Sequence, residues 1–230
     1  MTATRPGRRI SPLALDHLVV AADTLDQGVA WCESVLGVTP CAGGRHELFG
    51  THNRLLNITS QRFARAYLEI IAVDPQGPAP GRTRWFGLDD PWMRARLRES
   101  PRLIHAVVRA PSLEVHRRAL VAWGHDPGEP LRASRGALSW QIVVRPDGRL
   151  LAGGALPTLI QWDGAHPTDT NPTDTMPATG VALRGLALHG LAPQVALRLA
   201  TPGIDMLATP GPALRATLST PKGEVILESR

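Results

Sequence analysis

The sequence lacks any run of eighteen apolar residues, which excludes a membrane-spanning helix of the usual length. It has only two cysteines, Cys32 and Cys41, too few for a disulfide framework and without zinc-ribbon spacing. No long apolar stretch follows Arg8 and Arg9, so these arginines do not open an export signal. We therefore expect a cytoplasmic protein with ordinary thiols and no membrane partner.

Lysine is almost absent, because Lys222 is the one lysine among 25 basic residues. The formal net charge is +5 and the sequence pI is about 10.4, values that would suit nucleic acid if the cations were clustered. The arginines are instead scattered along the chain, with no basic run and no interleaved aromatic residues. We expect no nucleic-acid partner.

Three segments of the chain begin with the same pattern. The first opens with the apolar run 15–20, which suits a buried strand, and continues with apolar residues at helical spacing over 25–36, ended by Gly37. Similar openings start at Leu103 and Leu183. Each segment also closes with a strand-like apolar stretch. A repeat of this length predicts three structural modules.

We divide the 230 residues accordingly. The basic, proline-containing N-terminal segment is expected to be a mobile tail. A polar stretch rich in Thr, Asp and Pro is expected to link the last two modules. The boundaries are 1–12 for the tail, 13–75 for the first module, 76–102 for a connector, 103–164 for the second module, 165–180 for the polar linker, and 181–230 for a shorter third module.

Polar residues interrupt the apolar strands at matching positions of the modules. His17 lies in the first opening strand, and His105 takes its place in the second. At the matching position of the closing strands stand Glu69, Gln161 and Glu228. A buried polar group without a partner costs ~1–3 kcal/mol, and a buried unpaired charge costs more. The polar residues at the two ends of a module are therefore expected to meet.

Four stretches of sequence together resemble the glyoxalase-like domain proteins of the vicinal oxygen chelate superfamily. They are Leu-Asp-His at 15–17, Leu-Gly-Val at 36–38, GGRHELFGTHN at 43–53 and Tyr-Leu-Glu-Ile at 67–70. The resemblance implies an α+β fold, in which repeated βαβββ modules form a curled mixed sheet, or cup, here with the shorter third module added. In that superfamily the first and last strands of paired modules point side chains into the cup.

The resemblance also implies one divalent metal ion in the cup, held by His17, Glu69 and His105. Two imidazoles and one carboxylate leave positions open for a substrate, and they suit iron, manganese, zinc or nickel alike. The fourth family position falls on Gln161, a weak neutral ligand. Glu228 could replace it if the third module completes the cup.

Further residues are expected to line the cup or support it. The turn at 50–53 places His52 and Asn53 ahead of a strand, where they could face a substrate together with Gln161. Thr51 and Asn53 could equally serve the loop backbone. Trp85 and Phe86 lie in the connector, where anchoring to the core is favoured over capping the cup.

The function predicted is that of a metal-dependent enzyme acting on a small oxygenated substrate, of the lyase or isomerase type or a ring-cleaving dioxygenase. Hemithioacetal isomerisation is disfavoured, because Gln161 cannot serve as a base where related metalloenzymes often have Glu. The alternative is a metal-free small-molecule binding or resistance protein with the same cup. Catalytic residues remain unassigned. The partner is a small molecule, and a homodimer is left open.

Overall fold

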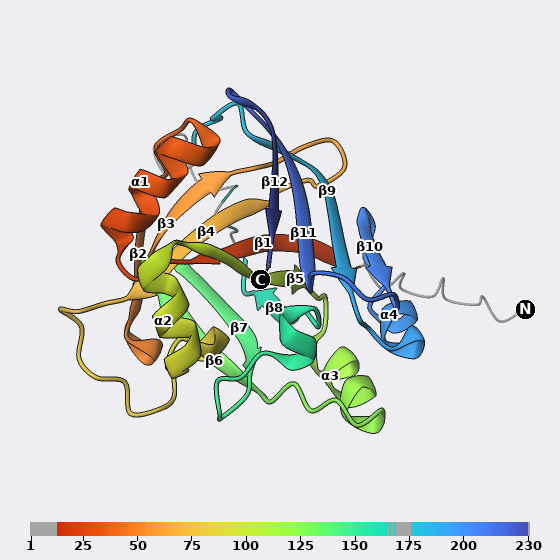
Figure 1. Cartoon of the computed structure of the whole chain (residues 1–230). Coiled ribbons are helices and arrows are strands. Elements are labelled where there is room, and N and C mark those ends of the chain that lie inside the picture. Colours follow the sequence, from red (N-terminus) through yellow and green to blue (C-terminus); the bar gives the residue numbers. More distant parts are fainter. Residues whose placement is uncertain (1–12, 165, 167, 169–175, 230) are drawn as a thin grey trace, which may run out of the picture.

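The computed structural model describes residues 13–164, 166, 168 and 176–229 (Figure 1). The N-terminal tail predicted at 1–12 and most of the predicted linker at 165–180 lie outside the described residues. No helix in the described part of the chain is long and apolar enough to cross a membrane.

An eight-stranded mixed sheet forms the main body of the protein, and its halves have the same βαβββ order. The first half contains β1 Ala14–Ala21, α1 Leu25–Leu36, β2 Cys41–His46, β3 Thr51–Asn57 and β4 Tyr67–Val73. The second half contains β5 Arg102–Arg109, α3 Leu113–Ala122, β6 Glu129–Arg135, β7 Leu138–Val144 and β8 Thr158–Trp162. The connector adds α2 Pro91–Glu99, and three 3-10 turns span Glu47–Phe49, Trp85–Gly87 and Leu151–Gly154.

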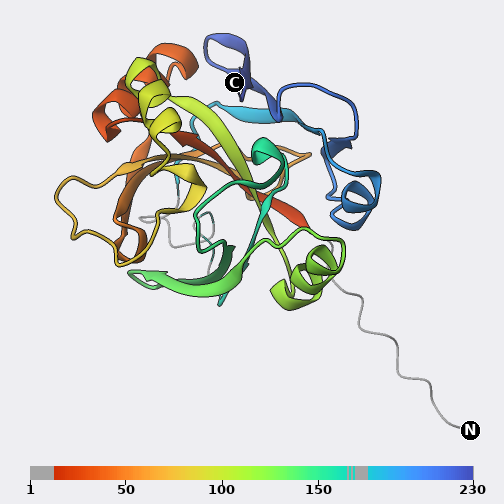
Figure 2. The same cartoon turned by 60° about the horizontal axis from the view of Figure 1, so that its bottom comes forward.

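The two halves are joined through their first strands. The strand order is β2-β3-β4-β1-β5-β8-β7-β6, in which β1 pairs antiparallel with β5. Each first strand also pairs parallel with the last strand of its own half, β1 with β4 and β5 with β8. The sheet curls so strongly that its two edge strands, β2 and β6, approach each other. Figure 2 looks toward the curled sheet, which is the predicted α+β cup.

The C-terminal segment forms a separate four-stranded sheet. Its elements are β9 Ala182–His189, α4 Pro193–Arg198, β10 Ile204–Leu207, β11 Leu214–Thr220 and β12 Gly223–Glu228, with strand order β10-β9-β11-β12. This sheet does not join the cup, so the cup is completed by the first two halves. At the turn between β11 and β12, Lys222 Nζ donates to the carbonyl oxygens of Glu33 and Ser34 at the end of α1, at 3.0 and 2.6 Å.

Two apolar cores lie on opposite faces of the large sheet. Along β1, Leu18 and Val20 face the outer core, which also contains apolar residues of α1, α3 and the four-stranded sheet. Val19 and Ala21 alternate with them and face the inner core. The inside of the cup is therefore a packed, largely apolar chamber in which every polar side chain needs a partner.

Gly28 is the point at which α1 packs most closely on β4. A Cβ at this position would collide with Cγ2 of the buried Ile70. Thr24 caps the same helix by accepting a hydrogen bond from Gln27 N, and Gly37 ends it, as predicted from the sequence. Close contact at Gly28 thus fixes the distance between helix and sheet.

We expect Gly28→Ala to destabilise the protein by about 1–3 kcal/mol, because overpacking outweighs the helix propensity gained with alanine. Urea unfolding would measure the change. Gly81→Ala is the matched control, since a Cβ at Gly81 meets nothing within 4 Å. A Gly28→Ala protein as stable as the wild type would contradict this packing.

Candidate active site in the cup

A β-bulge in β1 points two consecutive residues into the cup. The β1 to β5 register shifts between Leu15 and His17, so Asp16 lies at the irregularity. Both neighbouring side chains are buried, and the Nδ1 of His17 lies 2.7 Å from the Oδ1 of Asp16. In a regular strand, consecutive side chains point to opposite faces. The bulge is what allows Asp16 to contact the ring of His17 from within the protein.

Asp16 is fully buried and accepts hydrogen bonds from three elements. Besides His17, Trp162 Nε1 donates to its Oδ2 at 2.8 Å, and His166 Nε2 lies 3.0 Å from the same oxygen. Burial alone would raise the pKa of this carboxyl, but the hydrogen bonds from His166 and His17 outweigh burial and hold it well below its usual value. Asp16 is therefore an ionised carboxylate at neutral pH.

The ionised Asp16 fixes the tautomer of His17. A carboxylate can only accept, so Nδ1 of His17 donates to Asp16 and Nε2 is left to face the cup. This Nε2 lies 3.6 Å from Oε2 of Glu69. The imidazole also stacks on Tyr67, its neighbour in β4, with ring centroids 4.6 Å apart. Histidine and glutamate from the two ends of the first module thus meet, as the sequence predicted.

Asn53 holds the other oxygen of Glu69. Its Nδ2 donates to Oε1 of Glu69 at 2.6 Å, while its Oδ1 accepts from Gly44 N at 2.8 Å and Arg135 Nη1 at 3.1 Å. A Cβ at Gly43 would collide with that same Oδ1 of Asn53. Gly43 therefore makes room for the amide that orients the carboxylate, whereas a Cβ at Gly44 would collide with the side chain of Arg135.

His46 is a second imidazole beside Glu69. Its Nε2 lies 3.8 Å from Oε1 of Glu69, and its Nδ1 lies 3.1 Å from Thr51 Oγ1. Burial lowers the pKa of His46 to about 4, although Glu69 opposes the shift. His46 is therefore neutral at physiological pH and acts as a polar wall of the site, not as a cation.

These polar groups lie in a narrow inner pocket with a cavity volume of about 20 Å³. Its remaining walls are aromatic or aliphatic, and they comprise Tyr67, Trp85, Phe86, Trp140, Ile142, Ile160 and Trp162. Phe49, Trp85 and Phe86 form a continuous stack with centroid distances of 3.9 and 4.8 Å. The connector aromatics are thus buried in the cup, where they both anchor the connector and wall the pocket.

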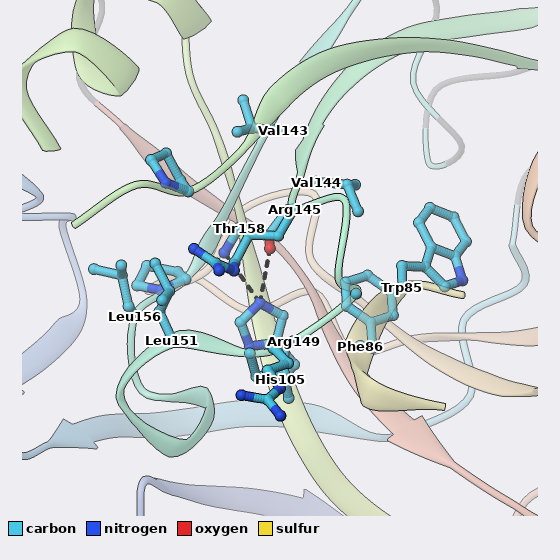
Figure 3. Close-up of a pocket in the computed structure, with 14 residues that line it drawn as sticks. Trp85, Phe86, His105, Val143, Val144, Arg145, Arg149, Leu151, Leu156 and Thr158 are labelled. Atoms are coloured by element: carbon cyan, nitrogen blue, oxygen red, sulfur yellow. Dashed lines mark hydrogen bonds between the residues drawn. The ribbon is translucent and has the colours of Figure 1, made fainter. Parts of the chain in front are cut away.

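The second half of the cup contains a separate pocket around His105, with a cavity volume of about 30 Å³ (Figure 3). Thr158 N donates to Nε2 of His105 at 3.1 Å, so this nitrogen is an acceptor and Nδ1 carries the proton. Nδ1 then donates to the carbonyl oxygen of Gly154 at 2.9 Å. Burial lowers the pKa of His105 to about 4. Both ring nitrogens are occupied, and the ring is neutral.

Strand register shows which residue of the second half corresponds to Glu69. In the first half Val19, two residues after His17, pairs with Glu69. In the second half Val107, two residues after His105, pairs with Thr158. Thr158 therefore occupies the position that the sequence alignment assigned to Gln161. Both Thr158 and Gln161 are neutral, so the second half has no carboxylate at the position that corresponds to Glu69.

The predicted site residues are only partly brought together. His17, Glu69 and Asn53 share the inner pocket, whereas His105 lines the other one. His52 and Gln161 alternate with pocket residues and face away. His52 lies 3.9 Å from Asp74, and Gln161 accepts from Leu113 N. Glu228 pairs with Arg215 in the four-stranded sheet, outside the cup.

The divalent ion predicted from the sequence requires free donor atoms on His17, Glu69 and His105. His17 and Glu69 have suitable donor chemistry, but the lone pair of His105 Nε2 is used by Thr158. Among the described residues, no three His, Cys, Asp or Glu side chains form a group that could hold a metal ion. The residues in place do not fit the predicted three-ligand site.

Several residues at this site had no assigned role in the sequence analysis. They are Asp16, His46, Arg135 and His166. Asp16 and His46 lie within stretches that carry the family resemblance, so a signal was present for both. Arg135 reaches the site only because β2 and β6 approach each other, and no local pattern marks such a contact.

A curled sheet of two βαβββ halves with polar side chains inside defines the vicinal oxygen chelate class of folds. A family described as "Glyoxalase-like domain" matches residues 15–202, and the chain belongs to that family. A search among curated proteins finds no match.

Solved structures that are similar to this chain share little sequence with it. A hypothetical protein from Staphylococcus aureus is 15% identical with a TM-score of 0.56, covering 96% of this chain and 87% of its own. Methylmalonyl-CoA epimerase from Mycobacterium tuberculosis is 18% identical (TM-score 0.40, 66% of this chain and 88% of its own). Methylmalonyl-CoA epimerase from Streptomyces coelicolor is 15% identical, with a TM-score of 0.45, and the match covers 68% of this chain and 99% of the epimerase. The similarity to the Staphylococcus aureus protein concerns the fold alone.

The buried neutral imidazoles make stability depend on pH. His46 and His105 have pKa values of about 4 in the folded chain, against about 6.5 when unfolded. Between pH ~4 and pH ~6.5 the unfolded state therefore binds more protons than the folded state. The contribution of the two neutral histidines to the free energy of unfolding is complete above pH ~6.5 and declines toward pH ~4. We expect the free energy of unfolding to fall by on the order of 2–3 kcal/mol per histidine over this interval.

Urea unfolding between pH 7.5 and 4.5 would measure this decline. His105→Gln should show a smaller decline than the wild type, whereas His125→Gln, outside the cup in the loop after α3, serves as the control. Stability that stays constant from pH 7 to 5 would contradict the burial of neutral imidazoles.

Proposed function

We propose that the chain is an enzyme of the lyase or isomerase type, which moves a proton on a small oxygenated substrate in the inner pocket. The observation that carries this proposal is the facing pair formed by His17 Nε2 and Glu69 Oε2, 3.6 Å apart. Each member is held from behind, His17 by Asp16 and Glu69 by Asn53. Two oriented proton-transfer groups in an apolar chamber are typical of general acid–base catalysis.

The reaction follows from the charges of these groups. The pair enters the reaction with one proton, carried either by Nε2 of His17 or by the carboxyl of Glu69, and its unprotonated member removes a proton from the carbon next to a substrate carbonyl. The electrons of that C–H bond move onto the carbonyl oxygen and form an enolate. The other member then returns a proton to the same or a neighbouring carbon. Ionised Asp16 stabilises positive charge on His17 during this exchange, in the manner of a carboxylate behind a catalytic imidazole.

The walls of the pocket support the same chemistry. Trp85, Phe86, Trp140 and Trp162 exclude water from the reacting groups, which strengthens electrostatic interactions with a developing enolate. The cavity volume of only about 20 Å³ limits the reacting part of the substrate to a small group.

Substitution of either proton-transfer residue should abolish catalysis. We expect Glu69→Gln and His17→Gln to reduce the rate by about 100-fold or more. The measurement is NMR detection of hydrogen–deuterium exchange in D₂O, on a panel of small 2-oxo acids, hydroxyketones and malonate-type carboxylates. Glu228→Gln is the matched control and should retain full activity, because Glu228 lies outside the cup.

Catalysed exchange that survives both Glu69→Gln and His17→Gln would refute these assignments. Saturable binding of panel members without exchange by the wild type would instead favour the small-molecule binding or resistance function.

The divalent metal predicted from the sequence is tested separately. We expect exchange activity to persist after EDTA treatment and desalting, because the proposed steps use only side chains. Metal content would be measured on protein purified without an affinity tag. About one ion per chain, lost together with activity in Glu69→Ala, would overturn the metal-independent reaction and favour metal-dependent catalysis.

A further inference from the structure

A large groove adjoins the inner pocket on its open side. It lies where the edge strands β2 and β6 approach each other, and its volume is about 600 Å³. It shares His46, Arg135 and Trp140 with the inner pocket. The two spaces are therefore neighbours, with these three side chains at the boundary between them.

The charged residues of the groove are mostly basic. The groove is lined by three arginines, Arg45, Arg132 and Arg135, and by one carboxylate, Glu47. Arg45 is paired with Asp74 at 3.1 Å, and the highly exposed Arg132 lies 3.4 Å from Asp163. An exposed contact of this kind contributes little and is readily exchanged for another anion.

Arg135 differs from the other two arginines. It is half-buried, and its Nη1 donates to the neutral amide oxygen of Asn53. Within the described part of the chain, no carboxylate lies in ion-pair distance of its guanidinium. A half-buried arginine keeps its charge and has five donors, so one amide contact leaves most of its binding capacity unused.

We propose that this groove binds an anionic group, a carboxylate or a phosphate, carried by the substrate on the side away from the reacting carbon. Arg135 contacts the anion at the junction, and Arg132 and Arg45 bind it farther out. The inference rests on the proposed function for the position of the reacting end. The small pocket then selects the reacting group, while the basic groove selects for a negatively charged substrate.

The test measures binding of simple anions to the full chain by calorimetry at low salt. Pyrophosphate and succinate are the two probes, and they distinguish a phosphate from a carboxylate ligand. We expect one of them to bind at a single site, with affinity falling as NaCl is added. The Arg132→Gln/Arg135→Gln variant should bind it about tenfold more weakly or worse.

A matched control removes the same charge elsewhere. Arg118→Gln/Arg198→Gln changes two exposed arginines of α3 and α4 and should bind the probe as the wild type does. Arg132→Gln alone, at a highly exposed position, keeps the test valid if the double variant folds poorly. Absence of binding by both probes, or equal loss in the control variant, would overturn the proposal.

The same measurements separate this proposal from the proposed function. Glu69→Gln should lose hydrogen exchange but keep anion binding. Exchange without groove-dependent anion binding would refute the groove alone. Anion binding without exchange would leave the groove in place and refute the proton-transfer function.

Discussion

The site depends on one buried charge, the carboxylate of Asp16. It has no exposure to solvent, so its ionisation is sustained by hydrogen-bond donors of the protein and by the nearby guanidinium of Arg109, 3.7 Å from its Oδ2. Those donors come from β1, from Trp162 at the end of β8 and from His166 just beyond it. The carboxylate therefore ties the opening strand of one half to the closing strand of the other. Because it sits behind His17, the same interaction orients the ring that faces Glu69.

The two halves of the cup show how the same fold can prepare a histidine for different roles. In the first half, a carboxylate takes the proton-bearing nitrogen of His17 and leaves the other nitrogen facing a pocket. In the second half, the backbone N–H of Thr158 donates to Nε2 of His105. The Nδ1 of His105 donates to the carbonyl oxygen of Gly154. The first arrangement leaves a lone pair for chemistry, whereas the second uses every donor and acceptor for structure.

The sequence was sufficient for the architecture and for part of the site. Apolar periodicity located the opening strands and α1, and polar residues within buried strands pointed to His17 and Glu69. Alternation along a strand, however, predicts that Asp16 and His17 face opposite sides, and the bulge that reverses this depends on pairing with β5. Alignment of short closing strands likewise selected Gln161 over Thr158, because register is set by pairing partners and not by local composition. Arg135 is 82 residues from Asn53 in the chain, so no local pattern could connect them.

The contact between Lys222 and the end of α1 gives the chain an unusual chemical property. Its Nζ is the one side-chain amine in the sequence, and it lies where the four-stranded sheet meets the helix of the cup. The ammonium group is engaged by two carbonyl oxygens, at a helix end that attracts positive charge. Among side chains, amine-directed reagents therefore have a single target. Acylation of Lys222 would remove the positive charge that connects the four-stranded sheet to α1. Because the sequence has one lysine, the contact between α1 and the four-stranded sheet can be labelled selectively without any amino-acid substitution.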